Sequence, residues 1–286
     1  MKAETILITG AGTGLGKLTA LTLGRLGKHV IATTETELQA TTLKNDADAL
    51  KIPLLVEKID ITDPIDREKA WSWEIDILVN NAAVKEGGSL IDIPEENFRK
   101  QYEVNVFGTL LFTQEFVRKM VQQRKGRIIF VSSISGLMVN PFSGPYASSK
   151  FAIEGLASTF SQELQEFNVE VATINLGPYL TGFNDREFNT WKTWHDDPAK
   201  RIFNYEKLAF PFKQMEPAKA VAPMIKTILG TTKAYRNIIP KLMFPLVELV
   251  NKFQWFKRST WRLGKRHMLV QQSYEIEPGS DGKYMI

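Results

Sequence analysis

The chain has 286 residues, of which 43% are hydrophobic and 24% are charged, a composition typical of a globular protein with a sizeable buried core. It contains no cysteine, which excludes disulfides, thiolate nucleophiles and cysteine-ligated metals, and its three histidines are too scattered to predict a metal site. No segment resembles a signal peptide or reaches the roughly 18 apolar residues of a spanning helix, so a cytoplasmic protein is expected.

The net charge of +4 comes from one C-terminal stretch. Residues 241–267 hold seven lysines and arginines against one acid, whereas the remaining chain holds 29 basic and 31 acidic residues. Because the body is slightly acidic and carries no recognition motif, no nucleic-acid partner is expected.

Short β-branched runs alternate with helix-like segments through most of the chain. Strands are predicted at residues 5–9, 29–33, 54–60, 76–80, 126–133, 169–177 and 236–240. Helices are predicted at residues 16–27, 95–122, 147–166 and 217–230. This alternation predicts an α/β fold with a doubly wound parallel sheet, a Rossmann-type arrangement of three αβα layers. No break in composition is sharp enough to predict a second independent domain.

A glycine-rich stretch, ITGAGTGLGK at residues 8–17, lies between the first predicted strand and the first predicted helix. Glycine lets the backbone turn sharply and approach a pyrophosphate, and the following helix offers unpaired N–H groups to that anion. The stretch therefore predicts a nucleotide-binding loop, with a merely flexible turn as the alternative. Its spacing is T-G-x-x-x-G-x-G, from Thr9 to Gly16.

That spacing and five further motifs resemble the short-chain dehydrogenase/reductase family, in its common single-domain form. The motifs follow the family's order: NNAA (80–83), NVFG (105–108), VSSISG (131–136), YASSK (146–150) and NLGPYLT (175–181). The resemblance spans residues 5 to about 181. It implies a dinucleotide-binding and catalytic domain over residues 1–240, with residues 183–215 as a substrate lid and residues 241–286 as a basic amphipathic extension.

Tyr146 and Lys150 are four residues apart at a predicted helix start, so both project from one face. A nearby ammonium lowers the pKa of a phenol, which is about 10 when unperturbed, so Tyr146 is predicted to act as acid and base. The alternative is a chance spacing with the lysine on a solvated face. Ser133 ends a predicted strand thirteen residues before Tyr146, which is the spacing of the family's catalytic serine. The neighbouring Ser132 and Ser135 do not have this spacing.

The resemblance implies a role for each of these residues in hydride transfer between a nicotinamide and an alcohol or carbonyl carbon. Tyr146 moves the proton, Ser133 polarises the substrate oxygen, and Lys150 lowers the phenol pKa and binds the nicotinamide ribose. The matching Asn105 is expected to distort its helix and hold a water linked to Lys150. The protein supplies position and electrostatics, and no metal is expected.

The resemblance also implies the residues that bind the cofactor. They are Gly10, Thr13, Gly14, Leu15, Gly16, Thr34, Glu35, Asp60, Ile61, Asn81, Ala82, Ala83, Tyr146, Lys150, Pro178 and Thr181. An acid after the second strand accepts the ribose 2′-hydroxyl of NAD, whereas an arginine favours the 2′-phosphate of NADP. Thr34 and Glu35 occupy this position and neither is basic, which favours NAD over NADP.

Three regions depart from a plain family pattern. Residues 64–73 predict a shortened crossover in which Trp71 or Trp73 covers the sheet. The aromatic residues of 183–215 predict either a roomy apolar pocket for a steroid-, retinoid- or lipid-like alcohol or ketone, or simple packing of the lid on the body. Residues 241–267 predict peripheral membrane contact, or a helix packed on the pocket or on a neighbouring subunit.

The sequence thus predicts an NAD(P)-dependent oxidoreductase with a small-molecule alcohol or ketone as substrate. The alternatives are an NAD(P)-binding regulatory protein without turnover and a membrane-peripheral scaffold. The resemblance also implies a homo-oligomer, a dimer or tetramer formed through the helices at 95–122 and 147–166.

Overall fold

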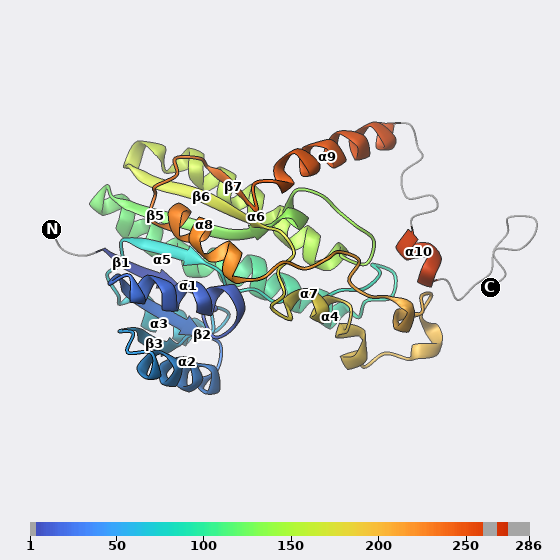
Figure 1. Cartoon of the computed structure of the whole chain (residues 1–286), viewed down its shortest axis with the longest axis horizontal. Coiled ribbons are helices and arrows are strands. Elements are labelled where there is room, and N and C mark those ends of the chain that lie inside the picture. The colour runs from blue at the N-terminus through green and yellow to red at the C-terminus, as the bar shows by residue number, and fades with distance from the viewer. Residues whose placement is uncertain (1–3, 260–267, 274–286) are drawn as a thin grey trace, which may run out of the picture.

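A computed structural model describes residues 4–259 and 268–273 (Figure 1). Within these residues, seven parallel strands form one sheet in the order β3-β2-β1-β4-β5-β6-β7. The strands are β1 Thr5–Ile8, β2 His29–Thr34, β3 Leu55–Lys58, β4 Ile77–Asn80, β5 Gly126–Ser133, β6 Val169–Leu176 and β7 Arg236–Ile239. The predicted doubly wound α/β fold is confirmed, and the order reverses direction beside β1, where such sheets bind ligands.

Helices cover both faces of the sheet because successive strand residues point to opposite sides. In β1, Ile6 and Ile8 pack with helices α1, α2 and α8, whereas Leu7 packs with α3, α5 and α6 on the other face. The bounds are α1 Gly14–Arg25, α2 Glu37–Ala49, α3 Pro64–Trp71, α5 Thr109–Gln123, α6 Gly144–Glu163 and α8 Ala218–Ile228. Each face therefore has its own apolar core.

The crossover between β3 and β4 is as short as the sequence predicts. Helix α3 has eight residues and begins after Asp63, whose carboxylate accepts a hydrogen bond from the Ile65 N–H at 2.8 Å. Trp71 donates from Nε1 to the Phe112 carbonyl at 3.0 Å, and Trp71 and Trp73 both pack, half-buried, against the core. The tryptophans therefore supply the cover that a longer helix would give.

The long helix predicted at residues 95–122 is not continuous. It consists of α4 Glu95–Tyr102, a π-helical turn over Glu103–Gly108 and then α5. A π-helical turn widens a helix by one residue per turn, and such turns are frequent at functional sites. The distortion that the resemblance implies around Asn105 is therefore present.

The chain after β6 contains the predicted lid, then α8 and β7, and then two C-terminal helices. The lid contains α7 Phe183–Glu187 and short 3₁₀ turns, while α9 Met243–Ser259 and α10 Met268–Ser273 follow β7. In Figure 1, α9 extends away from the sheet, whereas α10 lies beside the lid, where the Asn204 N–H donates to the Ser273 carbonyl at 2.9 Å. The C-terminal extension thus consists of two separate described helices, of which α10 packs on the lid.

Candidate active site

The glycine loop between β1 and α1 leaves no room for side chains at two positions. A Cβ on Gly10 would lie 2.6 Å from the Ala82 Cα, and Gly10 has a φ of +65°, which favours glycine. A Cβ on Gly16 would lie 2.5 Å from both the Gly10 carbonyl oxygen and Asn81 Nδ2. The loop backbone is therefore packed directly against the segment after β4.

Two polar side chains fix the loop in this position. Thr9 Oγ1 accepts hydrogen bonds from the N–H groups of Asn81 and Ala82, both at 3.0 Å. Asn81 Nδ2 donates to the carbonyls of Thr9 at 2.9 Å and Gly10 at 3.0 Å. Helix α1 follows, and its first turn carries no acidic residue and no side-chain cap. Its N-terminal N–H groups are thus available to an anion, and the loop fits the diphosphate of a dinucleotide.

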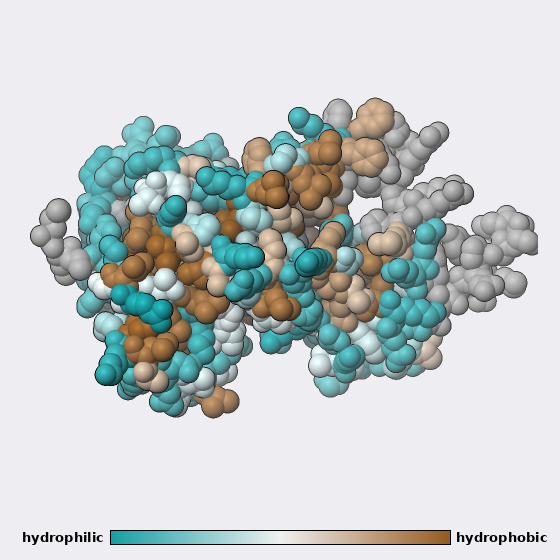
Figure 2. Space-filling view, in the orientation of Figure 1, coloured by the Kyte–Doolittle hydropathy of each residue, from teal (hydrophilic) through white to brown (hydrophobic). Residues whose placement is uncertain are grey.

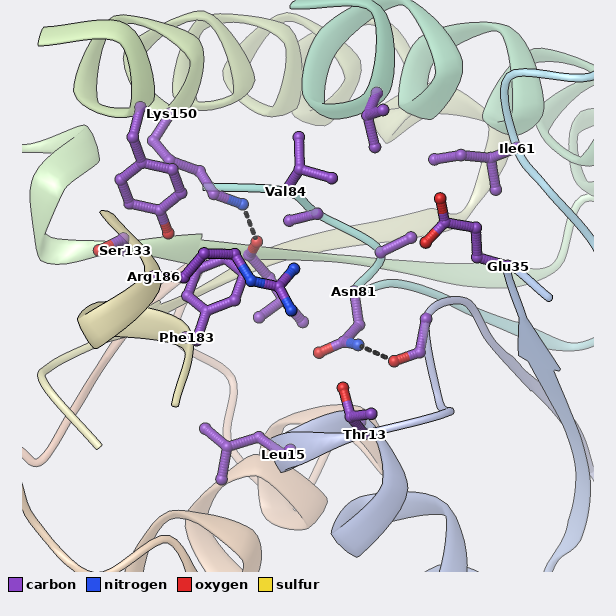
Figure 3. Close-up of a pocket in the computed structure, with 18 of the residues that line it drawn as sticks. Thr13, Leu15, Glu35, Ile61, Asn81, Val84, Ser133, Lys150, Phe183 and Arg186 are labelled. Atoms are coloured by element: carbon purple, nitrogen blue, oxygen red, sulfur yellow. Dashed lines mark hydrogen bonds between the residues drawn. The ribbon is translucent and has the colours of Figure 1, made fainter. Parts of the chain in front are cut away.

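A cavity of about 1260 Å³ runs from this loop to the end of β5 (Figure 3). The predicted site residues that line it are Gly10, Thr13, Gly14, Leu15, Gly16, Glu35, Asp60, Ile61, Asn81, Ala82, Ala83, Ser133, Tyr146, Lys150 and Thr181. Motifs far apart in the sequence therefore meet in one cleft, where the carboxyl ends of the parallel strands lie.

Three predicted residues do not line the cavity. Thr34 is fully buried and donates from Oγ1 to the Thr36 carbonyl at 3.1 Å, so of the pair after β2 only Glu35 faces the cleft. Pro178 lies between two lining residues but does not line the cavity itself. Direct contact of Thr34 and Pro178 with a ligand in this cavity is therefore not supported.

Asn105, the third, is 1% exposed and its side chain is used in packing. Its Oδ1 accepts from the Val84 N–H at 2.8 Å, and its Nδ2 donates to the Val84 carbonyl at 3.0 Å and to Ser149 Oγ at 3.2 Å. Asn105 therefore joins the segment after β4 to α6, which carries Tyr146 and Lys150.

The phenol of Tyr146 is buried beside Ser133, at the end of β5. Burial raises the pKa of Tyr146 above its usual range, and a hydrogen bond with the Ser133 hydroxyl acts in the opposite direction. The predicted lowering of this pKa by Lys150 is not what the structure gives. The Lys150 ammonium donates to the Val131 carbonyl at 2.9 Å and lies 5.7 Å from the centroid of the Tyr146 ring, and burial is the largest influence on the Tyr146 pKa.

Lys150 is itself 4% exposed, which is rare for a lysine. Burial lowers its pKa to about 8; the carboxylate of Glu154 opposes this shift and the charge of Lys85 adds to it. A lysine with a pKa near neutrality can exchange a proton, so the cleft holds two groups with displaced pKa values, as functional sites commonly do.

The lid contributes residues that the sequence motifs do not indicate. Phe183 stacks edge-on against Tyr146 with ring centroids 5.8 Å apart, and Arg186 extends into the cleft from α7 (Figure 3). Lys85 lies behind Tyr146, with its ammonium 4.8 Å from the ring centroid. Lys85 has one signal in the sequence: it is a basic residue in NNAAVKEGG, a run of mostly small residues that begins at the last residue of a buried strand.

Most lid aromatics pack the lid rather than line the cavity. Phe188, Trp194 and Tyr205 pack with Leu208 of the lid, with Phe142 from before α6 and with Leu269 of α10, and we call these six residues the aromatic lid cluster. Tyr205 donates from its hydroxyl to Asp92 Oδ2 at 2.9 Å, which ties the cluster to the loop after β4. Of the two interpretations of these aromatics, the structure favours packing of the lid on the body.

Within residues 4–259 and 268–273, no group of three histidine or acidic side chains is gathered as a metal site. No helix in this part of the chain has the length and hydrophobicity needed to cross a bilayer.

The parallel sheet, the glycine cradle and the buried Ser133, Tyr146 and Lys150 are the arrangement expected of a dinucleotide-dependent oxidoreductase. A family model described as short chain dehydrogenase matches residues 4–192, so the chain belongs to the short-chain dehydrogenase/reductase family. It is therefore an NAD(P)-dependent enzyme that acts on alcohol or carbonyl groups.

Known proteins support this assignment. An uncharacterized oxidoreductase, YusZ of Bacillus subtilis, is 38% identical over 86% of this chain and 90% of its own length. The 3-ketodihydrosphingosine reductase of Bacteroides thetaiotaomicron is 35% identical over 85% of this chain and 90% of its own. A Burkholderia phymatum short chain dehydrogenase/reductase solved with NAD matches with a TM-score of 0.74, at 19% identity over 91% of this chain and 95% of its own.

Proposed function

We propose that the protein reduces the ketone of a lipid-like, long-chain substrate to an alcohol, with NADH as the preferred cofactor. The observation that carries the proposal is that one cavity joins the glycine loop to Ser133, Tyr146 and Lys150. When bound, the nicotinamide supplies and accepts the hydride.

The protein side of this reaction is the handling of one proton. Tyr146 donates its phenolic proton to the substrate oxygen, while the Ser133 hydroxyl holds that oxygen by a hydrogen bond. The phenol is protonated at neutral pH, and burial, which raises its pKa further, keeps it in the form that can donate a proton to a bound ketone. Lys150, with its pKa near 8, is placed to bind the ribose hydroxyls and to return a proton to Tyr146. Asn105 holds the loop after β4 against α6, and the predicted water relay beside it belongs to this proposal.

The preference for NADH rests on Glu35. Its carboxylate lines the cavity at the end of β2, where it would accept the ribose 2′-hydroxyl and repel a 2′-phosphate. The family uses both cofactors, so the preference belongs to this residue and not to the fold.

The substrate class rests on the cavity wall and on one relative. Three apolar residues that line the cavity come from the body and the lid and contact the reacting groups: Leu176 beside Ser133, Val131 beside Lys150 and Phe183 beside Tyr146. One relative with a specific name, a 3-ketodihydrosphingosine reductase, is 35% identical over 85% of this chain. A long-chain ketone would use this apolar wall for its chain and Ser133 and Tyr146 for its oxygen.

Peripheral membrane contact through α9 is part of the same proposal. Leu242, Phe244, Leu246 and Leu249 are 85%, 51%, 52% and 66% exposed, and Figure 2 has a hydrophobic surface over this helix. Lysines such as Lys252 lie beside them, a combination typical of interfacial helices. A membrane surface is also where a lipid-like ketone would be found.

A dimer or tetramer through α5 and α6 is proposed on similar grounds. Phe107, Leu111 and Phe151, in or beside these helices, are 50%, 38% and 44% exposed. Light scattering of the purified chain measures the oligomeric state, and a monomer at micromolar concentration would contradict the proposal.

The test of the activity is a nicotinamide absorbance assay on the full-length protein. Ketones that share a head group and differ in chain length, 3-ketodihydrosphingosine among them, are offered with NADH and with NADPH. We expect turnover with kcat/KM increasing with chain length. If the cofactor binds and no ketone or alcohol turns over in either direction, the regulatory alternative replaces the proposal. A scaffold role would instead predict vesicle binding without cofactor affinity.

A further inference from the structure

A buried ion pair joins the lid to the body behind the ring of Tyr146. Lys85 lies in the loop after β4 and Glu187 ends α7; their side chains are 4% and 2% exposed, with Nζ and Oε2 2.8 Å apart. An isolated buried charge is strongly unfavourable, whereas a paired and hydrogen-bonded one is tolerated. Each member of the pair therefore depends on the other, and the pair exists only while the lid is docked.

The surroundings of the Lys85 ammonium come from three elements. Helix α7 supplies Glu187 and also Asn184, whose Oδ1 accepts from Lys85 Nζ at 2.9 Å. Aromatic rings surround the rest: the ring centroids of Tyr146, Phe210 and Phe183 lie 4.8, 5.4 and 5.8 Å from Nζ. Aromatic faces attract a cation, so the ammonium draws the phenol ring of α6 and the lid rings toward one point.

The backbone on both sides of Lys85 is held by buried amides. Asn105 binds the N–H and the carbonyl of Val84. Gln101, which is fully buried, accepts from the Glu86 N–H at 2.7 Å and donates to the Val84 carbonyl at 3.0 Å. The loop thus has few ways to move, and Lys85 is aimed at the lid by a rigid base.

We propose that the Lys85–Glu187 pair is a latch that fastens α7 to the loop after β4 and holds the ring of Tyr146 in its place in the cleft. Both members are positioning residues, because they act through Tyr146 and do not line the cavity. The kinetic consequence rests on the proposed function, whereas the fastening of the lid does not.

The charges around Tyr146 give the latch a distinctive signature. After burial, the Glu187 carboxylate further raises the pKa of Tyr146, while the Ser133 hydroxyl lowers it. The other charges nearby are the ammoniums of Lys85 and Lys150 and the guanidinium of Arg186, which lines the same cleft. Loss of the Glu187 carboxylate should therefore lower the pKa of Tyr146, and loss of the Lys85 ammonium should raise it.

The kinetic test uses Lys85→Met, Glu187→Gln and the double variant. Alcohol oxidation needs the deprotonated phenol, so its rate rises with pH. We expect Glu187→Gln to move this rise to lower pH, Lys85→Met to move it to higher pH, and the double variant to lie between them. At a fixed pH below the midpoint, each single change should alter kcat by about threefold or more, in opposite directions. Lys85→Arg should retain most of the wild-type profile.

The matched control is Lys69→Met. Lys69 and Glu57 form an ion pair with the same N–O distance of 2.8 Å, but their side chains are 50% and 31% exposed. This variant should leave the pH profile and the lid unchanged, because a solvated pair contributes little.

Hydrogen exchange of residues 183–215 in the full-length protein tests the latch without turnover. We expect the α7 amides to exchange about tenfold faster or more in Lys85→Met and in the double variant, because loss of the ion pair lowers the free energy of local opening. The latch would be overturned if Lys85→Met and the double variant turned over at the wild-type rate, and if their pH profiles and α7 exchange rates equalled those of Lys69→Met. Faster exchange in a protein that turns over no ketone would leave the latch standing and remove the proposed function.

Discussion

The two walls of the cleft are held by different kinds of contact. The cofactor wall is built from backbone: Gly10 and Gly16 pack against the segment after β4 so closely that a Cβ would not fit. The lid wall is held from behind by pairs of side chains that do not line the cavity: Lys85 with Glu187, and Tyr205 with Asp92. The first wall is fixed by local sequence and the second by pairs that meet only in the folded chain, so the two should respond differently to substitution.

The largest effect is expected from Tyr146→Phe, at the point where the two walls meet. The change removes the proton donor and keeps the ring that packs on Phe183. We expect kcat to fall by about a hundredfold to ten-thousandfold, with NADH affinity nearly unchanged. Steady-state kinetics and fluorescence titration of NADH measure the two quantities. Wild-type turnover in this variant would refute the acid–base assignment.

Gly16→Ala tests the cofactor wall. The new Cβ would collide with the Gly10 carbonyl oxygen, which cannot move without displacing the loop. We expect NADH affinity to fall by about tenfold or more. Gly155→Ala is the matched control, because Gly155 is also a helix residue and a Cβ there meets no atom within 4 Å.

The control should bind NADH normally and unfold at a slightly higher temperature, since alanine favours a helix by about 1 kcal/mol over glycine. Equal NADH affinity in the two glycine variants would contradict the predicted phosphate site.

The residues of the predicted cofactor wall do meet in one cavity, because the signals that point to them are short. The glycine spacing, the Tyr146–Lys150 pair and the position of Ser133 each depend on a few neighbouring residues and on one strand end. The lid wall has no such local signal. Lys85 and Glu187 become partners only when the chain returns past β4, and the aromatic lid cluster could equally have lined a pocket.

The same reasoning explains the two corrections near the reacting groups. A four-residue spacing places Lys150 on the face of Tyr146, but the hydrogen bond that turns its ammonium to Val131 depends on the register of β5. Burial of the phenol depends on the docked lid. The direction of the Tyr146 pKa shift therefore follows from tertiary packing, which the YASSK motif alone does not contain.

Glu35→Ala probes the edge of the cofactor wall, where a smaller effect is expected. Removing the carboxylate should weaken NADH binding and ease NADPH binding, so that the preference between them changes by about tenfold, or about 1.4 kcal/mol. Glu37→Ala is the control: Glu37 is an exposed carboxylate two residues further on that does not line the cavity. Titration with both cofactors gives the ratio. A wild-type preference for NADPH would overturn the role given to Glu35.

The smallest effect is expected outside both walls, at α9. Replacing Leu246 and Leu249 by serine removes two exposed apolar side chains, whereas Val247 between them is buried and anchors the helix to the body. If α9 lies on a bilayer, co-sedimentation with anionic vesicles should weaken severalfold, because burial of each leucine contributes about 1.5–3 kcal/mol when it is complete and less when it is partial. Activity on a short, water-soluble ketone should not change, since neither leucine lines the cavity. If the variant folds and sediments with vesicles as the wild type does, α9 does not contact the bilayer. Its apolar surface would then contact a neighbouring subunit, and light scattering should show that the variant has lost an oligomer.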